Sequence, residues 1–486
     1  MTSIVTIDDN FVCATLDWWP TGKCSALVPR GKSIVEETYA TSKLRVSDRD
    51  TWAKAGILNL DLNTILDNAV KSFNSLRIRI GGSLQDQILY KVGNAIKECP
   101  SFSNDTKGLF GFSQDCLTME RWDQINTLLT FGLNALTGRK KVSDDNNLYV
   151  GNWNPKNARD LMRYTISKGC KIDSWELGNE LCGGGVAARI LPDQYAKDVK
   201  VLRRLINKLY KDEVSTFYDE EWFSVFLQAS GPNVVDGVTH HIYNLGPSDS
   251  SDIQGRFNNH PALGPWSSAW VGESGGAYNS GGKDVSHTFV NGFCYLDQLG
   301  MTSTFNHKVF CKQALIGRNY ALLNTTSLIP NPDYYGALLW YRLMGRNVLS
   351  TTHNGSPYLR VYSHCSKHQP GITLLLINMS NSTSFNVSVV NDLNLYPLSQ
   401  NKQSAKAQSG QQREEYHLTP KDGNIQSDVV LLNGTPLVLT EDSDIPPLNP
   451  IKVGPSSPIN IAPDSVVFAT LQGFKPPPKV KRLFWI

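Results

Sequence analysis

The strongest constraint on the fold is a change in hydrophobic pattern near residue 345. Before that point, strand-like runs such as residues 75–80 and 172–177 alternate with helical stretches such as residues 158–168 and 194–210. Such alternation is typical of parallel βα units, and this many of them predict an α/β barrel. After about residue 347 the chain shows short alternating strands separated by turns, which predict a β-sandwich.

These patterns predict two domains. Residues 1–345 would form an α/β domain, a (β/α)8 TIM barrel, and residues 346–486 a C-terminal β-sandwich. The chain has 486 residues, which is enough for both, because such a barrel typically takes about 250 residues. In a barrel of this kind the carboxyl ends of the strands form the active-site face.

Charge and hydropathy exclude several classes of function. Lys and Arg number 47 against 44 Asp and Glu, and this near-balance predicts no nucleic-acid partner. No apolar run reaches the ~18–20 residues of a membrane span, although peripheral association with a membrane stays open. Residues 1–10 lack the features of a signal peptide, whereas seven Asn-x-Ser/Thr sequons suit a secreted glycoprotein. The compartment is therefore not decided by these features.

Two segments share one construction. Residues 174–181 read SWELGNEL and residues 269–276 read AWVGESGG. In each, an apolar strand containing Trp runs into Gly and then a carboxylate, Glu180 or Glu273. Glycine permits a sharp turn and a close approach by a ligand. We therefore expect both glutamates to point into one site at the strand ends.

Two carboxylates in one site are what glycosidic bond cleavage requires, one to protonate the leaving oxygen and one to attack the anomeric carbon or activate water. Glu180 follows Asn179, whose amide suits a sugar 2-hydroxyl, so Glu180 is the better acid/base candidate and Glu273 the better nucleophile. The alternative is structural, since an Asn-Glu pair usually caps a helix or lies in solvent. Glu176 is a rival carboxylate, but strand alternation sends it to a different face from Leu177.

Other polar residues near strand ends allow two interpretations each. His240 and His241 are adjacent on a strand, so they point to opposite faces, and no third ligand is evident; we predict no metal and no cofactor. A Tyr or His near the nucleophile would instead hold its carboxylate. Arg77 and Arg79 share one strand face and either pair with buried carboxylates or line the barrel opening. Residues 278–282 are either a ligand-binding loop or an ordinary surface turn.

These segments resemble those of a known protein family. The chain resembles the plant heparanase-like proteins of glycoside hydrolase family 79, which are related to animal heparanase and plant β-glucuronidases. The matching motifs are DDNFVCATLDWWP at 8–20, GGSLQD at 81–86, DCLTMERW at 115–122, SWELGNEL at 174–181, VTHHIYNLGP at 238–247, WVGESGGAYNSG at 270–281 and NPDYYGALLWYRLMG at 331–345.

The resemblance implies a retaining β-glucuronidase that works by double displacement. It places the acid/base at Glu180 and the nucleophile at Glu273, with Tyr243 positioning the nucleophile. It further implies that Asp86 and Asn179 contact sugar hydroxyls. Tyr278 and the loop through Ser280 would bind the glucuronate carboxylate. The partner would be a glucuronic-acid-containing glycan or a phenolic glucuronide, in a secreted, extracellular or vacuole-like compartment.

The chain also departs from the family pattern. Residues 25–56 are an atypical insertion, and residues 246–268 are shorter than the helical connection of relatives. Only the polar segment KDEVST precedes Phe217, so the fifth barrel strand is predicted to be missing or shortened and the barrel irregular. Arg318 stands where relatives tend to have Gly.

Two rival functions remain open. One is a catalytically inactive relative that binds acidic glycans through the same residues, and the other is a barrel glycosidase for a neutral sugar. Both keep the motif residues, so only activity discriminates between them. The aglycone, exo or endo action and oligomeric state cannot be read from the sequence.

Overall fold

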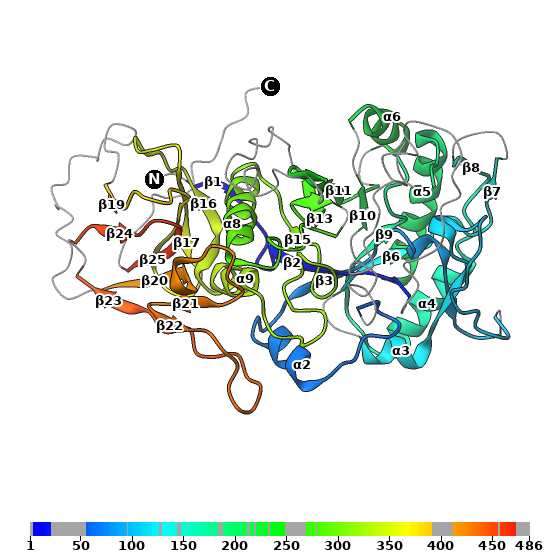
Figure 1. Ribbon diagram of the computed structural model, residues 1–486. Helices are drawn as coiled ribbons and strands as arrows, with labels where there is room; N and C mark the ends of the chain where they lie inside the picture. Colours follow the sequence, from blue (N-terminus) through cyan, green and yellow to red (C-terminus); the bar gives the residue numbers. More distant parts are fainter. Residues whose placement is uncertain are drawn as a thin grey trace, which may run out of the picture.

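The computed structural model describes residues 3–20, 55–94, 96–125, 129–142, 147–182, 188–210, 214–217, 220–231, 234–247, 269–278, 280–390, 412–454 and 457–472. Most of the predicted insertion at 25–56 and of the connection at 246–268 lies outside these residues. Figure 1 shows the barrel on one side of the molecule and a large β-sheet, coloured yellow to red, on the other.

A closed barrel of parallel strands forms the larger part, which confirms the predicted α/β barrel. Each strand pairs with its neighbour in chain order, and the last pairs with the first, so that Cys311 lies opposite Cys13. The strands are β2 (Val12–Leu16), β3 (Arg77–Ile80), β6 (Leu129–Leu133), β9 (Ile172–Leu177), β10 (Val214–Phe217), β11 (Gly237–Ile242), β13 (Ala269–Ser274) and β15 (Phe310–Lys312).

The expectation of a missing fifth strand is wrong. β10 occupies that place, pairing with β9 through Val214 and Trp175 and with β11 through Thr216 and Val238. The strand has only four residues and lies in a polar segment, so the hydrophobic pattern did not reveal it. Backbone hydrogen bonds to both neighbouring strands hold it in the barrel. Closure leaves no sheet edge between the two candidate glutamates.

Helices cover the outside of the barrel. α4 and α5 begin and end within two residues of the stretches that the sequence predicted, and each buries one apolar face. α8 is buried along almost its whole length, because it lies between the barrel and the large sheet. The helices are α2 (Thr64–Lys71), α3 (Met119–Gln124), α4 (Lys156–Ser167), α5 (Pro192–Leu209), α6 (Glu220–Ser230), α8 (Phe289–Thr304) and α9 (Pro332–Leu343).

The C-terminal part is built on a nine-stranded sheet, over one face of which a two-stranded ladder packs. Its central strands pair antiparallel, and β1 from the start of the chain joins it beside β16. Whether this arrangement is a separate β-sandwich domain stays a prediction. The large sheet comprises β1 (Ser3–Thr6), β16 (Met344–Leu349), β17 (Leu359–Ser366), β18 (Gly371–Asn378), β25 (Ser465–Gln472), β20 (Arg413–Pro420), β21 (Val430–Leu432), β22 (Thr435–Pro436) and β23 (Ile451–Val453), and the ladder β19 (Phe385–Val387) and β24 (Ile459–Ile461).

The barrel and the sheet meet at α8. Gly300 is needed there, because a Cβ at this position would lie 2.2 Å from the ring of Tyr362 on β17. The Tyr362 hydroxyl donates a hydrogen bond to Asp297 on the same helix. This contact fixes the sheet against the helix that follows β13, the strand carrying Glu273.

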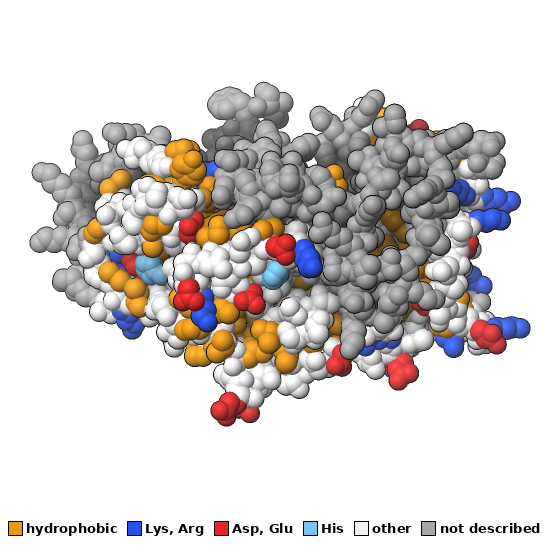
Figure 2. All heavy atoms as spheres, in the orientation of Figure 1, with side chains coloured by type: hydrophobic (Ala, Val, Ile, Leu, Met, Phe, Trp, Pro, Cys, Tyr) orange, Lys and Arg blue, Asp and Glu red, His pale blue; other side chains and the backbone are white. Residues whose placement is uncertain are grey.

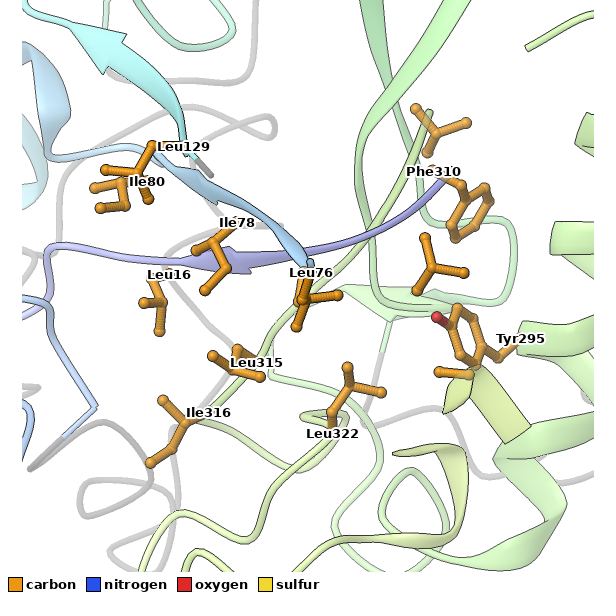
Figure 3. Packing of buried hydrophobic residues seen from close by; sticks show 14 of the residues in the cluster. Leu16, Leu76, Ile78, Ile80, Leu129, Tyr295, Phe310, Leu315, Ile316 and Leu322 are labelled. Carbon is orange, nitrogen blue, oxygen red and sulfur yellow. The ribbon is translucent and has the colours of Figure 1, made fainter. Parts of the chain in front are cut away.

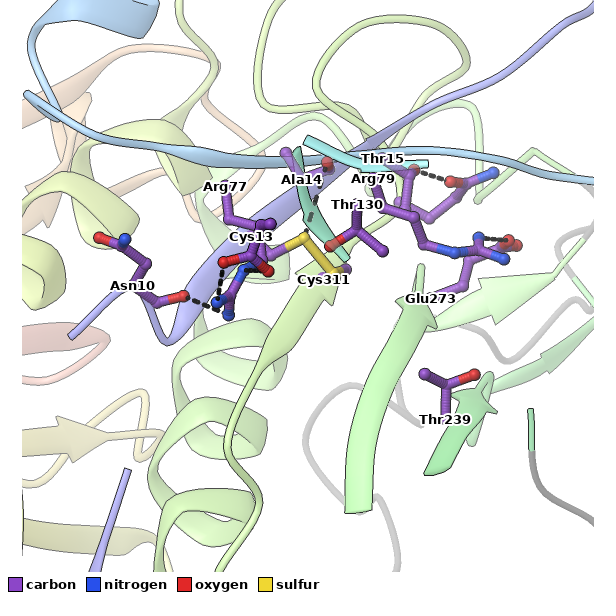
Figure 4. The surroundings of a disulfide bond; sticks show 12 residues. Asn10, Cys13, Ala14, Thr15, Arg77, Arg79, Thr130, Thr239, Glu273 and Cys311 are labelled. Carbon is purple, nitrogen blue, oxygen red and sulfur yellow. Dashed lines mark hydrogen bonds and ion pairs between the residues drawn. A yellow bond between two sulfur atoms is a disulfide. The ribbon is translucent and has the colours of Figure 1, made fainter. Parts of the chain in front are cut away.

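Alternation along the barrel strands separates an apolar layer from a polar one. Leu16, Ile78, Ile80 and Leu129 point outward into the layer between strands and helices (Figure 3). The polar residues between them, including Thr15, Arg79, Thr130 and Thr239, point into the barrel (Figure 4). A disulfide between Cys13 and Cys311 joins β2 to β15 within this interior. The polar interior leads to the strand ends where the candidate site lies.

The surface agrees with the balanced composition. On the face drawn in Figure 2, acidic and basic side chains are scattered among apolar and neutral ones and form no large area of one sign. Within the described part of the chain, no helix has the length and apolar character needed to cross a bilayer.

Candidate active site

The chain turns sharply after β9 and brings Glu180 to the rim, by which we mean the carboxyl ends of the barrel strands. Gly178 and Glu180 both have left-handed backbones, with φ of 71° and 52°. A Cβ on Gly178 would lie 2.9 Å from the Cβ of Ala135, which together with the left-handed backbone favours glycine. Asp86 fixes the turn because its carboxylate accepts hydrogen bonds from the backbone N–H groups of Asn179 and Ala135, at 3.0 and 2.7 Å.

Glu273 lies within β13 rather than after it. The pairing of β11 with β13 shifts register here, so that His241 stands opposite Glu273. The Glu273 side chain is 12% exposed, whereas the Glu180 side chain is 24% exposed. Both predicted glutamates therefore reach the rim, Glu273 more deeply buried than Glu180.

His241 lies between the two glutamates. Its Nδ1 is 2.7 Å from Oε1 of Glu180 and 3.8 Å from Oε2 of Glu273. Laid end to end, these two distances set an upper limit of about 6.5 Å on the separation of the two oxygens. The strands that the sequence patterns identified thus bring both carboxylates into one site.

Arg79 connects the two strand ends from inside the barrel. Its Nε lies 2.8 Å from Glu176, and its Nη2 donates to the Asn179 amide oxygen at 2.9 Å. Its Nη1 lies 3.4 Å from Glu273, a contact drawn in Figure 4. Arg79 is 1% exposed. Of the two interpretations of this arginine, the structure shows the pairing with buried carboxylates. Glu176 is fully buried below the rim, where Thr239 also donates to it.

The Tyr243 hydroxyl donates a hydrogen bond to Oε1 of Glu273. Burial and the negative charge of Glu273 raise the pKa of Tyr243 well above its usual value, so the phenol keeps its proton and remains a donor. Glu273 thus accepts hydrogen bonds from Tyr243 and Arg79.

Burial raises the pKa of Glu180, but the hydrogen bond and charge of His241, with the charge of Arg79, outweigh it and bring the net pKa below its usual value. Burial also raises the pKa of Asp86 to about 7, against the backbone hydrogen bonds that it accepts. Asp17 has its pKa raised to about 7 by burial and by the charge of Glu273. Asp86 and Asp17 thus bind a proton more tightly than usual, and Glu180 binds one less tightly.

The remaining predicted residues lie on loops beyond β13. Tyr278 is partly exposed on β14 (Ala277–Tyr278), which pairs with β12 (Gly246–Pro247). Ser280 is buried, with φ of 83°, and its hydroxyl accepts a hydrogen bond from Arg318. Asn279, between them in the predicted loop, lies outside the described residues. That these residues, Asn179 and Asp86 contact a sugar stays a prediction.

Sequence reasoning did not single out Asp17 or Tyr320. Asp17 follows β2 directly, as the candidate glutamates follow or end their strands, and this signal was present in the motif LDWWP. Tyr320 lies close to Gly275, where a Cβ would be 2.8 Å from its ring, and no local pattern predicts that contact.

Alternation correctly separated the paired histidines. His241 faces the rim, whereas His240 lies on the other side of β11, its ring centroid 5.0 Å from that of His307. Among the residues that the structure describes, no group of three or more His, Cys, Asp or Glu side chains could hold a metal ion.

Comparisons with known proteins identify the family of this chain. The family model described as glycosyl hydrolase family 79, N-terminal domain, matches residues 1–30 and 46–300. Heparanase-like protein 2 of Arabidopsis thaliana is 44% identical over 523 residues, covering 98% of this chain and 93% of that protein. Baicalin-beta-D-glucuronidase of Scutellaria baicalensis is 37% identical over 513 residues, covering 96% and 90%.

Solved structures support the fold. A 4-O-alpha-L-rhamnosyl-beta-D-glucuronidase from Fusarium oxysporum aligns with a TM-score of 0.61 at 14% identity, over 96% of this chain and 97% of that one. An alpha-L-arabinofuranosidase from Thermotoga maritima aligns with a TM-score of 0.55, also at 14% identity, over 84% and 89%. At such identities the likeness concerns the fold alone. From the family match and the full-length relatives together, this chain belongs to glycosyl hydrolase family 79, a family of glycosidases.

Proposed function

We propose that this chain is a retaining β-glucuronidase that removes β-linked glucuronic acid from a polysaccharide, a glycoprotein glycan or a phenolic glucuronide. The observation that carries the proposal is the limit of about 6.5 Å between oxygens of Glu180 and Glu273. Retaining glycosidases hold their two carboxyl groups about 5–5.5 Å apart, whereas inverting ones need about 6.5–9.5 Å to admit a water molecule. The upper limit includes the whole retaining range and reaches only the lowest value of the inverting range, so it supports retention.

In the first step, an oxygen of Glu273 attacks the anomeric carbon. The bond from that carbon to the leaving oxygen breaks, and Glu180 gives its proton to that oxygen. In the second step, Glu180 takes a proton from water, the water oxygen attacks the anomeric carbon, and Glu273 is released. Both carboxylates end the cycle as they began.

The partners of each glutamate support this division of roles. Glu273 accepts from Tyr243 and Arg79, which stabilise the anion that a nucleophile must be. Glu180 instead has a partner that can itself titrate, since His241 Nδ1 lies at 2.7 Å. This contact lowers the pKa of Glu180 in the free protein, so the acid role requires Glu180 to be protonated once the substrate is bound.

The substrate class rests on the relatives. One is named for the β-D-glucuronide of baicalin, and another, from Hirudo nipponia, is named hyaluronoglucuronidase. Both names describe removal of, or cleavage at, glucuronic acid. We extend that substrate preference to this chain as part of the proposal. It rests on Tyr278 and Ser280, which are expected to bind the carboxylate of the substrate.

Hydrolysis of 4-nitrophenyl β-D-glucuronide tests the proposal, with the wild type measured beside Glu273→Gln and Glu180→Ala. We expect turnover in the wild type and its loss in Glu273→Gln. Circular dichroism and thermal unfolding of each variant would show whether it is folded. A wild type that folds cooperatively but hydrolyses no glucuronide would overturn the proposal. Retained binding of acidic oligosaccharides would then indicate a catalytically inactive glycan-binding relative.

We also propose that the protein enters a secretory or vacuole-like compartment. Five of its seven sequon asparagines are exposed, namely Asn104, Asn324, Asn354, Asn381 and Asn386, and two disulfides are present. Asn378 is fully buried, its amide donating to the backbone oxygens of Thr383 and Ala462. Mass spectrometry of protein from its native source should find glycans at exposed sequons and none at Asn378. Unmodified asparagines throughout would contradict this localisation.

A further inference from the structure

Arg318 joins the loop after β15 to the loop after β14. Its guanidinium donates a hydrogen bond to the Ser280 hydroxyl. The next residue completes the contact, since the backbone N–H of Asn319 donates to the Ser280 carbonyl at 3.0 Å and its side-chain amide to the Gly281 carbonyl at 3.1 Å. Ser280 belongs to the loop expected to bind the substrate carboxylate, so Arg318 adds a permanent positive charge to that loop.

The groups around Arg318 belong to the rim. The guanidinium carbon lies 5.6 Å from the ring centroid of Trp19. The charge of Arg318 acts on Asp17 and on Tyr320, lowering the pKa of each against the larger effect of burial. Glu273 acts on the same two residues in the opposite direction. Arg318 and the candidate nucleophile therefore act on the same two side chains.

An anionic sugar needs a counter-charge in this site. Asp17, Glu180 and Glu273 lie at the rim, and each would repel a substrate carboxylate while ionised. Arg79 is 1% exposed and is engaged with Glu176, Asn179 and Glu273 below the rim. Arg318 is partly exposed on the loop side, where its planar guanidinium suits a carboxylate.

The backbone at this position favours glycine. Arg318 has φ of 64°, in the left-handed region, which is unfavourable for a residue with a Cβ. Arg318 thus occupies an unfavourable backbone position and contacts the candidate binding loop. Such strain is typical of functional sites.

We propose that Arg318 is a specificity-determining residue, whose guanidinium binds the carboxylate of a uronic acid together with the loop that carries Ser280. This inference rests on the proposed glucuronidase function and names the residue that selects the acidic sugar over its neutral counterpart. Arginine binds both the serine hydroxyl and the substrate carboxylate, so that the loop and the ligand are held by one group.

The test compares two substrates that differ at the carboxylate, 4-nitrophenyl β-D-glucuronide and 4-nitrophenyl β-D-glucoside. The ratio of their kcat/KM values is measured for the wild type, Arg318→Gln, Arg318→Gly and Arg318→Lys. We expect Arg318→Gln to lower the ratio about 10- to 100-fold, mainly through the KM of the glucuronide, because a hydrogen bond to a charged group is lost. Arg318→Lys should keep part of the preference, since it keeps the charge without the planar fork.

Arg346→Gln is the matched control. Arg346 is exposed, lies near Asp9 at 3.5 Å, and exchanges backbone and side-chain hydrogen bonds with Ile7, before the start of β2 and so at the far end of the barrel from the rim. This variant loses the same charge and should leave the ratio unchanged. Arg318→Gly guards against misfolding, because glycine suits the left-handed backbone.

A ratio that stays the same in Arg318→Gln and Arg318→Gly would overturn the inference, as would a rise in glucuronide activity. If the wild type hydrolyses neither substrate, the proposed function is contradicted. The role of Arg318 in binding the carboxylate can then still be tested. Calorimetric titration with free glucuronic acid and with glucose then gives the selectivity of binding. Preference for glucuronic acid that is lost in Arg318→Gln supports the role of Arg318, and preference that persists contradicts it.

Discussion

The ends of β9 and β13 look alike in sequence but hold their glutamates in different ways. Glu180 lies on a left-handed turn, is more exposed, and has a titratable partner in His241. Glu273 lies within its strand, is more deeply buried, and accepts from Tyr243 and Arg79, which remain donors at neutral pH. One strand end can exchange a proton, and the other stabilises an anion.

The proposed acid/base and nucleophile roles therefore depend on the side chains that contact each glutamate rather than on the shared sequence motif. A Trp, a Gly and a Glu place a carboxylate at the rim, whereas residues from β3 and β11 decide what that carboxylate can do. Variants that remove one neighbour at a time should therefore affect the two strand ends differently.

The largest effect should come from removing the glutamates themselves. Glu180→Ala should slow hydrolysis of a glucuronide with a poor leaving group by about 10²- to 10⁴-fold, because general acid assistance is lost. A nitrophenyl glucuronide needs less assistance and should lose less. Azide added to Glu180→Ala should give the β-glucuronyl azide, whereas azide added to Glu273→Ala should give the α-anomer. The product anomers are read by NMR, and the reverse pairing would exchange the two roles.

The next effect concerns Arg79, which supports both strand ends. Arg79→Met leaves Glu176, which is fully buried, without its ion pair. We expect the free energy of unfolding to fall by about 3–5 kcal/mol in urea denaturation. Lys71→Met is the control, since the Lys71–Asp67 pair is exposed and worth about 1 kcal/mol or less. Equal losses in both variants would refute the central position of Arg79.

Tyr243 supports only the β13 end. Tyr243→Phe removes the donor to Glu273 and keeps the ring. We expect kcat for the glucuronide to fall about 10- to 100-fold, because a hydrogen bond to a charged group in a buried site is lost. Tyr164→Phe removes a surface hydroxyl that donates to Asp123 and should change nothing. A Tyr243→Phe enzyme with wild-type kcat would show that Glu273 needs no such donor.

The smallest effect concerns Asp86, which holds the β9 turn. Burial raises its pKa to about 7, so the folded chain binds this proton more tightly than the unfolded chain, whose Asp has a pKa near 3.8. The contribution of Asp86 to stability is thus fully present below about pH 4 and is lost as pH rises through 7. In Asp86→Asn the fall in unfolding free energy between pH 5 and pH 8 should be smaller, by about 2 kcal/mol. Identical pH profiles would contradict the raised pKa.

Sequence patterns predicted the barrel and both glutamates because these depend on local features, namely alternation along strands and glycine at turns. They failed for β10, since a strand of four residues is held by backbone pairing to neighbours distant in the chain. They did not predict that Arg79 joins Glu176, Asn179 and Glu273, which lie about 100 to 190 residues away in the sequence. Such contacts follow only from closure of the barrel.

Covalent trapping tests directly whether Glu273 is the nucleophile. The wild type is incubated with a 2-deoxy-2-fluoro-β-D-glucuronyl fluoride, which forms the glycosyl-enzyme but delays its hydrolysis, and the protein is digested and sequenced by mass spectrometry. We expect a single fluoroglucuronyl group on Glu273. A label on Glu180 or any other residue, or complete turnover to the α-anomer with no label, would contradict it.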